Sequence, residues 1–217
     1  MGVFEIYKQL LKAFGNQNWW PVENNFHPKE WEICAGAILT QNTNWNNVEK
    51  ALNNMRKAGC VTIEDVLEID EKDLRELIKP AGFYKQKAER LKIFAEAVGS
   101  SENLKTFLRK TSRENLLRIK GIGPETADSI LLYAGNRRFF VVDAYTKRVF
   151  SRLGVFPENQ NYETVRKFFE KNLPKNIKIY KEFHALIVKL AKDFCRKKPF
   201  CEKCPLKEDC SFKGVRK

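Results

Sequence analysis

The sequence predicts an all-α fold with two helical lobes. Along most of the 217 residues, apolar side chains recur at the three- and four-residue spacing of amphipathic helices. Helix-start signals precede several of these stretches, and Gly or Pro follows them. Only Phe139-Phe140-Val141-Val142 has the composition of a strand, and four residues do not make a sheet. Because 43% of the residues are apolar, such a chain can bury a substantial core.

The helices of the first half are predicted from apolar stripes that fall on one helical face. Thr62-Ile-Glu-Asp65 is a helix-start pattern, and Pro80 with Gly82 ends a later stripe. The stripes run, in order, from Ile6 to Phe14, Ile33 to Ile38, Val48 to Leu52, Val66 to Ile78, and Leu91 to Val98.

In the second half, Thr111-Ser-Arg-Glu114 has the spacing of a capping box, and Pro124 suits the first turn of the next helix. Further helices are expected near 143–153, 162–172 and 176–194. We expect residues 30–135 to form one domain, with a helical hairpin at about 114–134 at its end. Residues 1–29 with 136–217 would form the second lobe, and a cleft would lie between the two.

The charge balance favours a polyanionic partner. Forty Lys and Arg residues against 27 Asp and Glu give a net charge of +13, which is typical of nucleic-acid binding and also of a Lys-rich solvated surface. The chain has neither an apolar run of about 20 residues nor a signal-peptide core, so we expect a cytoplasmic protein with no membrane partner.

Two glycines one residue apart separate the hairpin helices. In Lys120-Gly121-Ile122-Gly123, glycine permits positive φ, so backbone N–H groups can turn outward toward a phosphate while Ile122 enters the core. A plain turn between two helices, with a C-capping glycine, is the alternative.

Four of the six cysteines lie within sixteen positions near the end of the chain. Clustering in a chain without an export signal indicates metal ligation rather than disulfides. Four thiolates at short spacing suit either zinc or a [4Fe–4S] cluster. The spacing is Cys195-x5-Cys201-x2-Cys204-x5-Cys210.

The hairpin and a later Val-Val-Asp together resemble the endonuclease III superfamily of helix-hairpin-helix DNA glycosylases. Ile-Lys-Gly-Ile-Gly-Pro-Glu-Thr-Ala precedes Val141-Val142-Asp143 in the order and spacing of that family. The resemblance covers roughly residues 30 to 210 and implies base excision with Asp143 as the essential carboxylate. Asp143 also suits the N-cap of the next helix. Glu125 stands where bifunctional members have their Schiff-base lysine, so we expect no AP-lyase activity.

Trp-Trp-Pro and Ala-Ile-Leu-Thr-Gln-Asn-Thr (37–43) look like the 3-methyladenine branch of the superfamily, which also has glutamate at the lysine position. An aromatic slot would hold a flipped, cationic base. The resemblance implies that Gln41 fills the gap left by that base. It implies DNA contacts from Lys120, Gly121, Ile122 and Gly123. The implied base pocket comprises Trp19, Trp20, Pro21, Trp45 and Glu125.

The superfamily carries a [4Fe–4S] cluster at the position of the four cysteines, usually with six residues in the first gap, whereas here the gap has five. We therefore expect this cluster on Cys195, Cys201, Cys204 and Cys210, with zinc as the alternative. A second departure from the branch is Leu186, which stands in place of its special lysine on the last helix.

The expected function is that of a monofunctional base-excision-repair DNA glycosylase, acting as a monomer on double-stranded DNA with a damaged base, in the nucleoid. The expected substrate is an alkylated purine such as 3-methyladenine. Two alternatives stay open: a glycosylase for mismatched or oxidised bases, and a non-catalytic helix-hairpin-helix module that only binds DNA.

Overall fold

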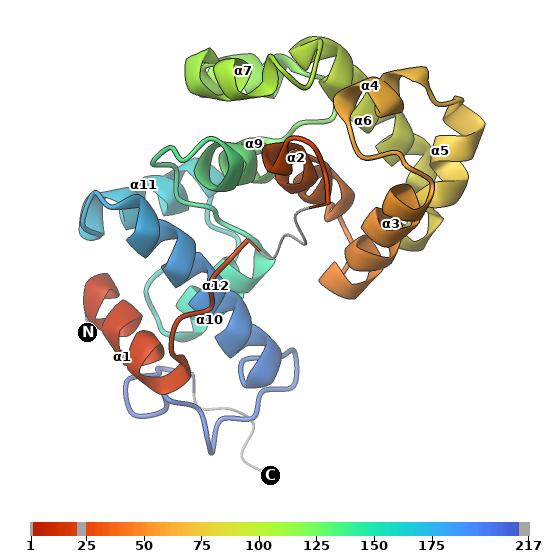
Figure 1. The fold of residues 1–217 in the computed structure, drawn as a ribbon. Helices are drawn as coiled ribbons and strands as arrows, with labels where there is room; N and C mark the ends of the chain where they lie inside the picture. The colour runs from red at the N-terminus through yellow and green to blue at the C-terminus, as the bar shows by residue number, and fades with distance from the viewer. Residues whose placement is uncertain (1, 21–24, 213–217) are drawn as a thin grey trace. The chain divides into compact units, whose positions relative to one another are not determined.

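The computed structural model describes residues 2–20 and 25–212, and its contacts divide the chain into two compact units. The first unit comprises Met1–Trp19 and Arg137–Lys217, and the second comprises Trp20–Asn136. No β-strand occurs within the described ranges, so the predicted all-α class is confirmed (Figure 1). Pro21, one of the predicted pocket residues, lies outside the described residues.

The second unit is built around helix α2 (Lys29–Leu39). Every residue from Trp31 to Leu39 is buried, as expected for a helix enclosed by its neighbours. The helices α3, α6, α7 and α9 and the π-helix η2 all pack against it. The unit's elements are α2, α3 (Trp45–Lys57), α4 (Ile63–Glu68), α5 (Glu71–Leu77), the 3-10 turn η1 (Lys79–Ala81), α6 (Tyr84–Val98), α7 (Leu104–Lys110), α8 (Arg113–Arg118), α9 (Pro124–Ser129) and η2 (Ile130–Ala134).

Of the two helix starts predicted in this unit, one lies at the predicted residue and the other lies one residue later. Thr62 and Asp65 cap each other's backbone at the start of α4, so that pattern is confirmed as a capping box. The predicted box at Thr111 and Glu114 is wrong by one residue. The N–H of Thr111 donates to the Phe107 carbonyl, which makes Thr111 the C-cap of α7. Ser112, with extended backbone, is the N-cap of α8 and accepts from the Asn115 N–H at 3.0 Å.

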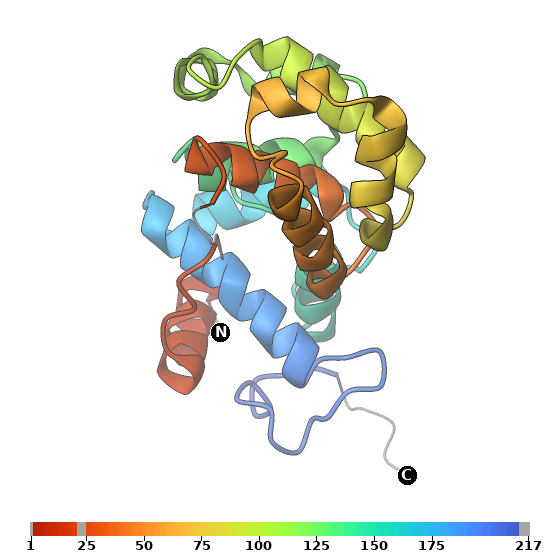
Figure 2. The ribbon, with the colours of Figure 1, turned by 45° about the vertical axis from the view of Figure 1, so that its right-hand side comes forward.

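The first unit packs α12 (Ile177–Asp193) against α1 (Val3–Phe14) and α10 (Ala144–Arg152), with α11 (Tyr162–Asn172) completing it (Figure 2). Aromatic rings form its core: Phe140 stacks on Phe169 at 4.2 Å between centroids, and Phe150 meets Phe169 edge-on at 4.7 Å. The segment from Phe139 to Val142 brings Phe140 into this core without forming a strand. It thereby sets the start of α10, where Asp143 stands.

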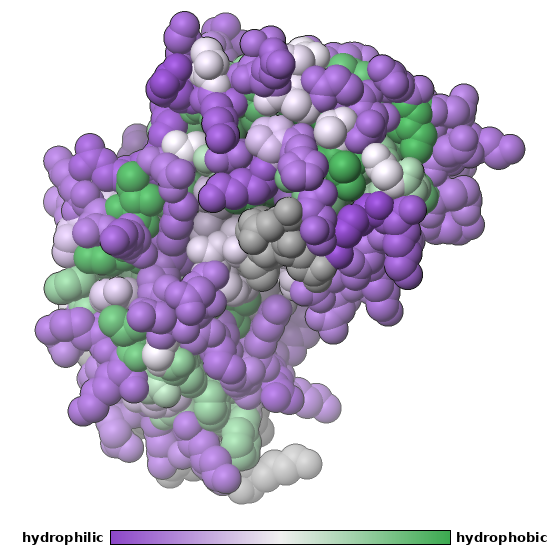
Figure 3. Space-filling view, viewed as in Figure 1, coloured by the Kyte–Doolittle hydropathy of each residue, from purple (hydrophilic) through white to green (hydrophobic). Residues whose placement is uncertain are grey.

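The face of the protein seen in Figure 3 is largely hydrophilic, with scattered apolar side chains, in keeping with the net charge of +13. Across the described residues, no helix is both long enough and apolar enough to cross a bilayer.

Candidate active site and nucleic-acid interface

Asp143 is held at the N-terminus of α10 by its own helix. Its Oδ1 accepts hydrogen bonds from the Thr146 N–H at 2.7 Å and from the Thr146 hydroxyl at 2.8 Å. Its Oδ2 lies 3.6 Å from Nε2 of His184 on α12. The Asp143 side chain is 14% exposed and that of His184 is 6% exposed, so the pair is largely shielded from water.

The surroundings of Asp143 favour its ionised form. Burial alone would raise its pKa, but His184 and the two donors of Thr146 outweigh that effect and hold the pKa below its ordinary value of 3.8. A carboxylate fixed through one oxygen and shielded from water retains a negative charge that can act on a developing cation.

His184 joins Trp19 to this group. The Trp19 ring meets the His184 ring edge-on at 5.8 Å, so Trp19, His184 and Asp143 form one cluster inside the first unit. The sequence predicts Trp19 and Asp143 as site residues, whereas His184 joins them only in the structure. No spacing signal could have found His184, because it lies 41 positions after Asp143 and on a different helix.

A second aromatic cluster lies in the other unit, where the Trp20 ring meets those of Trp45 and Tyr133 at 5.2 and 5.0 Å. A Cβ on Gly36 would lie 3.3 Å from the Trp20 ring, so the bare backbone of α2 lets the indoles approach closely. Tyr133 is missed by sequence reasoning. Trp31 is completely buried and stacks on Phe94, which makes it a core residue.

The helical hairpin is formed by α8, a turn and α9. Gly121 has φ +87°, Ile122 is 3% exposed and enters the core, and Gly123 stands exposed as the N-cap of α9. Glu125 lies exposed in the first turn of α9. Lys120 forms an exposed ion pair with Glu89, with Nζ and Oε1 2.5 Å apart. The turn therefore presents backbone on the surface and anchors itself through one apolar side chain.

A buried ion pair braces the two hairpin helices. Arg113 Nε lies 2.6 Å from Asp128 Oδ1, and Arg113 Nη2 lies 3.0 Å from Asp128 Oδ2. The side chains are 9% and 0% exposed. A bidentate contact of this kind fixes the relative rotation of α8 and α9.

Gln41, just after α2, is bound to the hairpin. Its Nε2 donates to the Gly121 carbonyl at 3.0 Å and to the Thr126 hydroxyl at 2.9 Å, and its Oε1 accepts a hydrogen bond from Arg90 on α6. The structure thus brings together two of the predicted DNA-binding positions. Phe83 at the start of α6 is 61% exposed with φ +47°, and it is another surface residue that sequence reasoning missed.

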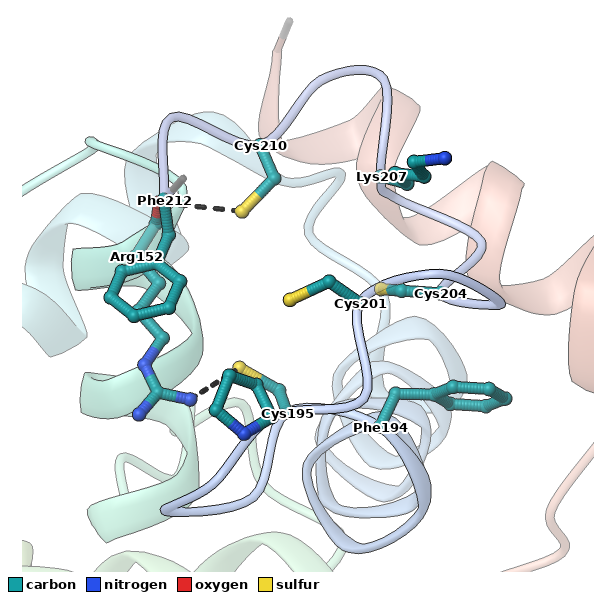
Figure 4. A pocket seen from close by; sticks show the side chains of 9 residues that line it. Arg152, Phe194, Cys195, Cys201, Cys204, Lys207, Cys210 and Phe212 are labelled. Atoms are coloured by element: carbon teal, nitrogen blue, oxygen red, sulfur yellow. Dashed lines mark hydrogen bonds between the residues drawn. The ribbon is translucent and has the colours of Figure 1, made fainter. Parts of the chain in front are cut away.

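The four C-terminal cysteines line one pocket of the first unit, and the sulfurs of Cys195, Cys201 and Cys210 point toward a shared space (Figure 4). All four are free thiols. Burial, reinforced by the neighbouring cysteines, raises the pKa of Cys204. The loop is attached to α10, because Arg152 Nη1 donates to Cys195 Sγ at 3.4 Å. Among the described residues, no three His, Cys, Asp or Glu side chains are arranged to hold a single metal ion.

Comparison with known proteins identifies the class. Residues 35–175 match the model of the HhH-GPD superfamily base excision DNA repair proteins, so the chain belongs to that family. It is therefore a DNA-binding, base-excision-repair DNA glycosylase. The prediction of an endonuclease III-like helix-hairpin-helix glycosylase is confirmed.

Two known proteins are similar in sequence to most of this chain. A putative DNA repair glycosylase of Methanocaldococcus jannaschii is 52% identical over 202 residues, which cover 90% of each chain. Endonuclease III of Thermotoga maritima is 26% identical over 196 residues, which cover 88% of this chain and 84% of that protein.

Among solved structures, the H. pylori 3-methyladenine DNA glycosylase bound to 1,N6-ethenoadenine is similar with a TM-score of 0.76 and 31% identity, covering 88% of this chain and 98% of that one. An endonuclease III–DNA covalent intermediate is similar in fold, with a TM-score of 0.80 and 20% identity, covering 96% of this chain and 93% of that one.

Proposed function

We propose that this glycosylase is monofunctional and releases alkylated purines such as 3-methyladenine from duplex DNA, with water as the nucleophile. The observation that carries the proposal is Asp143, a shielded carboxylate whose pKa lies below its ordinary value. Cleavage of an N-glycosidic bond leaves positive charge on the deoxyribose, and a fixed anion beside the sugar stabilises that state. The same carboxylate can orient or deprotonate the attacking water.

Glu125 supports a reaction without strand cleavage. A carboxylate cannot form an imine with the sugar, and residues 120–128 match the motif in which lyases have lysine at this position. Borohydride added during turnover should trap no covalent protein–DNA adduct. A trapped adduct would show that another amine attacks the sugar, and the monofunctional assignment would fail.

The aromatic residues support an alkylated base as substrate. Trp19, Trp20, Pro21 and Trp45, with Glu125, would hold a base that carries a positive charge on its ring, because a cation over an indole face gains about 0.5–2 kcal/mol. An alkylated purine is also a good leaving group and needs little acid catalysis. The 31% identical structure of a 3-methyladenine DNA glycosylase supports the same substrate class.

DNA would be bound through the hairpin. The backbone of Gly121, Ile122 and Gly123 is suited to a phosphate oxygen, and Lys120 adds a cation if it exchanges Glu89 for DNA. Gln41 would enter the gap left by the extruded base. We propose that the protein acts as a monomer.

The four-cysteine pocket fits a [4Fe–4S] cluster. Cys195, Cys201, Cys204 and Cys210 supply four free thiols around one space, which is the donor set that such a cluster requires. When bound, the cluster would supply iron atoms that the four cysteine thiolates bind, and these bonds would cross-link the loop from 195 to 210. A brown protein with iron and sulfide in cluster amounts is expected, and a colourless protein with one zinc per chain would reject the cluster.

The substrate class is tested by base release from a panel of duplexes. Free 3-methyladenine from methylated DNA, with strand nicks only after alkali, is the expected result. Release from mismatched or oxidised pairs alone would move the enzyme to another substrate class. Tight DNA binding without release from any duplex would favour the non-catalytic module.

A further inference from the structure

We propose that Arg90 is a positioning residue that presets Gln41 against the hairpin, so that Gln41 is already oriented when the damaged base leaves the duplex. The inference rests on the proposed function, in which Gln41 fills the gap in the DNA. It concerns a side chain outside the hairpin and outside the residues that the sequence predicts for the site.

Three hydrogen bonds fix the Gln41 amide. Arg90 donates to Oε1, while both hydrogens of Nε2 are used by the Gly121 carbonyl and the Thr126 hydroxyl. Arg90 can only donate and the Gly121 carbonyl can only accept, so together they define which end of the amide holds the oxygen. Without Arg90, Oε1 loses this hydrogen bond, and the amide keeps only the two contacts made by Nε2.

The stem of Arg90 lies directly over the hairpin turn. A Cβ on Gly121 would come within 2.7 Å of Arg90 Cδ and of Arg90 Nε, so the absent side chain provides the space that Arg90 crosses. Glycine is therefore needed at position 121 for two reasons: it adopts the positive φ of the turn, and it leaves room for the Arg90 side chain. Arg90 thus connects the predicted phosphate site to Gln41 through direct contacts with both.

The same helix also fixes the backbone before Gln41. Lys87, one turn earlier on α6, is 1% exposed and donates to the carbonyls of Leu39 and Ala81, each at 2.8 Å. Leu39 is the last residue of α2 and lies two positions before Gln41. One face of α6 therefore holds both the backbone that leads to Gln41 and its side chain. Such ordering lowers the entropy that Gln41 must lose when it enters DNA.

The test is a double-mutant cycle on DNA binding, which needs no substrate assignment. The probe is a duplex with a tetrahydrofuran abasic analogue and 2-aminopurine beside it, compared with the undamaged duplex. Its readouts are the ratio of the two dissociation constants and the 2-aminopurine fluorescence. The variants are Arg90→Ala, Gln41→Ala, the double variant and Arg90→Lys. Arg109→Ala is the control, because it removes an exposed charge of the same unit.

If Arg90 acts through Gln41, each single alanine variant lowers the preference for the abasic duplex about tenfold, the scale of ordering one long side chain. The double variant then loses no more of the preference for the abasic duplex than Gln41→Ala does alone. Arg90→Lys restores affinity for the undamaged duplex without restoring the preference, and Arg109→Ala weakens both duplexes equally.

Two results would overturn the proposal while leaving Gln41 in its proposed role. If the loss of preference in the double variant equals the product of the losses in the two single variants, Arg90 acts on DNA independently of Gln41. A variant Arg90→Ala that behaves like Arg109→Ala would show that only its charge matters. If Gln41→Ala itself keeps the full preference, the proposed role of Gln41 fails, and the inference about Arg90 falls with it. Arg90→Lys serves as the test variant should Arg90→Ala not fold.

Discussion

Because Arg113 and Asp128 form a buried ion pair, we expect the substitution Asp128→Asn to lower the free energy of unfolding strongly. Asp128→Asn keeps the size of the side chain but takes the negative charge of the Asp128 carboxylate away from the Arg113 guanidinium, which is 9% exposed. Breaking a buried pair by removing one partner costs about 3–5 kcal/mol, because the remaining charge stays desolvated. In a chain of this length, the melting temperature falls by roughly 2–4 °C per kcal/mol, so the expected decrease is roughly 6–20 °C.

Calorimetry and denaturant titration of the purified protein measure this change. The matched control is Glu76→Gln, which breaks the pair with Lys79, whose side chains are 60% and 55% exposed. An exposed pair contributes less than about 1 kcal/mol, so this variant should melt close to the wild type. A loss from Asp128→Asn that is no larger than that of the control would refute the reasoning. Replacing both Arg113 and Asp128 by apolar residues should recover much of the loss.

Three further predictions concern titrating groups and the cysteines. His184→Asn removes a partner that lowers the pKa of Asp143, so base release should fail at a higher pH on the acid side of the pH–rate profile, whereas the exposed His27→Asn leaves that limb unchanged. Burial lowers the pKa of Lys87 from 10.5 to about 8, so the unfolded chain holds that proton more tightly and the free energy of unfolding rises with pH between these values. Denaturant titrations at pH 8 and 10 should show a smaller rise in the free energy of unfolding for Lys87→Met than for the wild type. An equal rise in both proteins would contradict this prediction. Cys204→Ser should lose the visible absorption and iron of a cluster, and full retention of both would remove Cys204 from the ligands.

Much of the fold follows from local rules that act within a few residues. Helical spacing and caps such as Thr62 are properties of short segments, so the sequence displays them directly. Thr111 shows the limit of such rules, because it ends α7 while the extended residue after it, Ser112, takes the N-cap position of α8. Only the packed structure determines which of two neighbouring residues takes that role.

The candidate site divides in the same way. Asp143 and the Gly-x-Gly turn stand in short motifs. Asp143 is the N-cap of α10, and that position leaves it available as the proposed catalytic carboxylate. His184 reaches Asp143 from another helix, Arg90 reaches Gln41 from another helix, and neither belongs to a motif. Tyr133 lies on the π-helix η2, whose wider turn changes the side-chain register in a way that ordinary helical spacing does not predict.

In the proposed reaction the charge of Asp143 drives base release, and the variant Asp143→Asn separates that charge from the N-cap role. Asparagine is as good an N-cap as aspartate, so α10 should remain intact and the change removes mainly the negative charge. The measurement is the single-turnover rate of base release from methylated duplex DNA, with Asp193→Asn as the control at a half-buried aspartate that is paired with Lys189. We expect unchanged duplex binding, and a rate at least about 100-fold lower in Asp143→Asn alone. A rate within a few-fold of the wild type would contradict it.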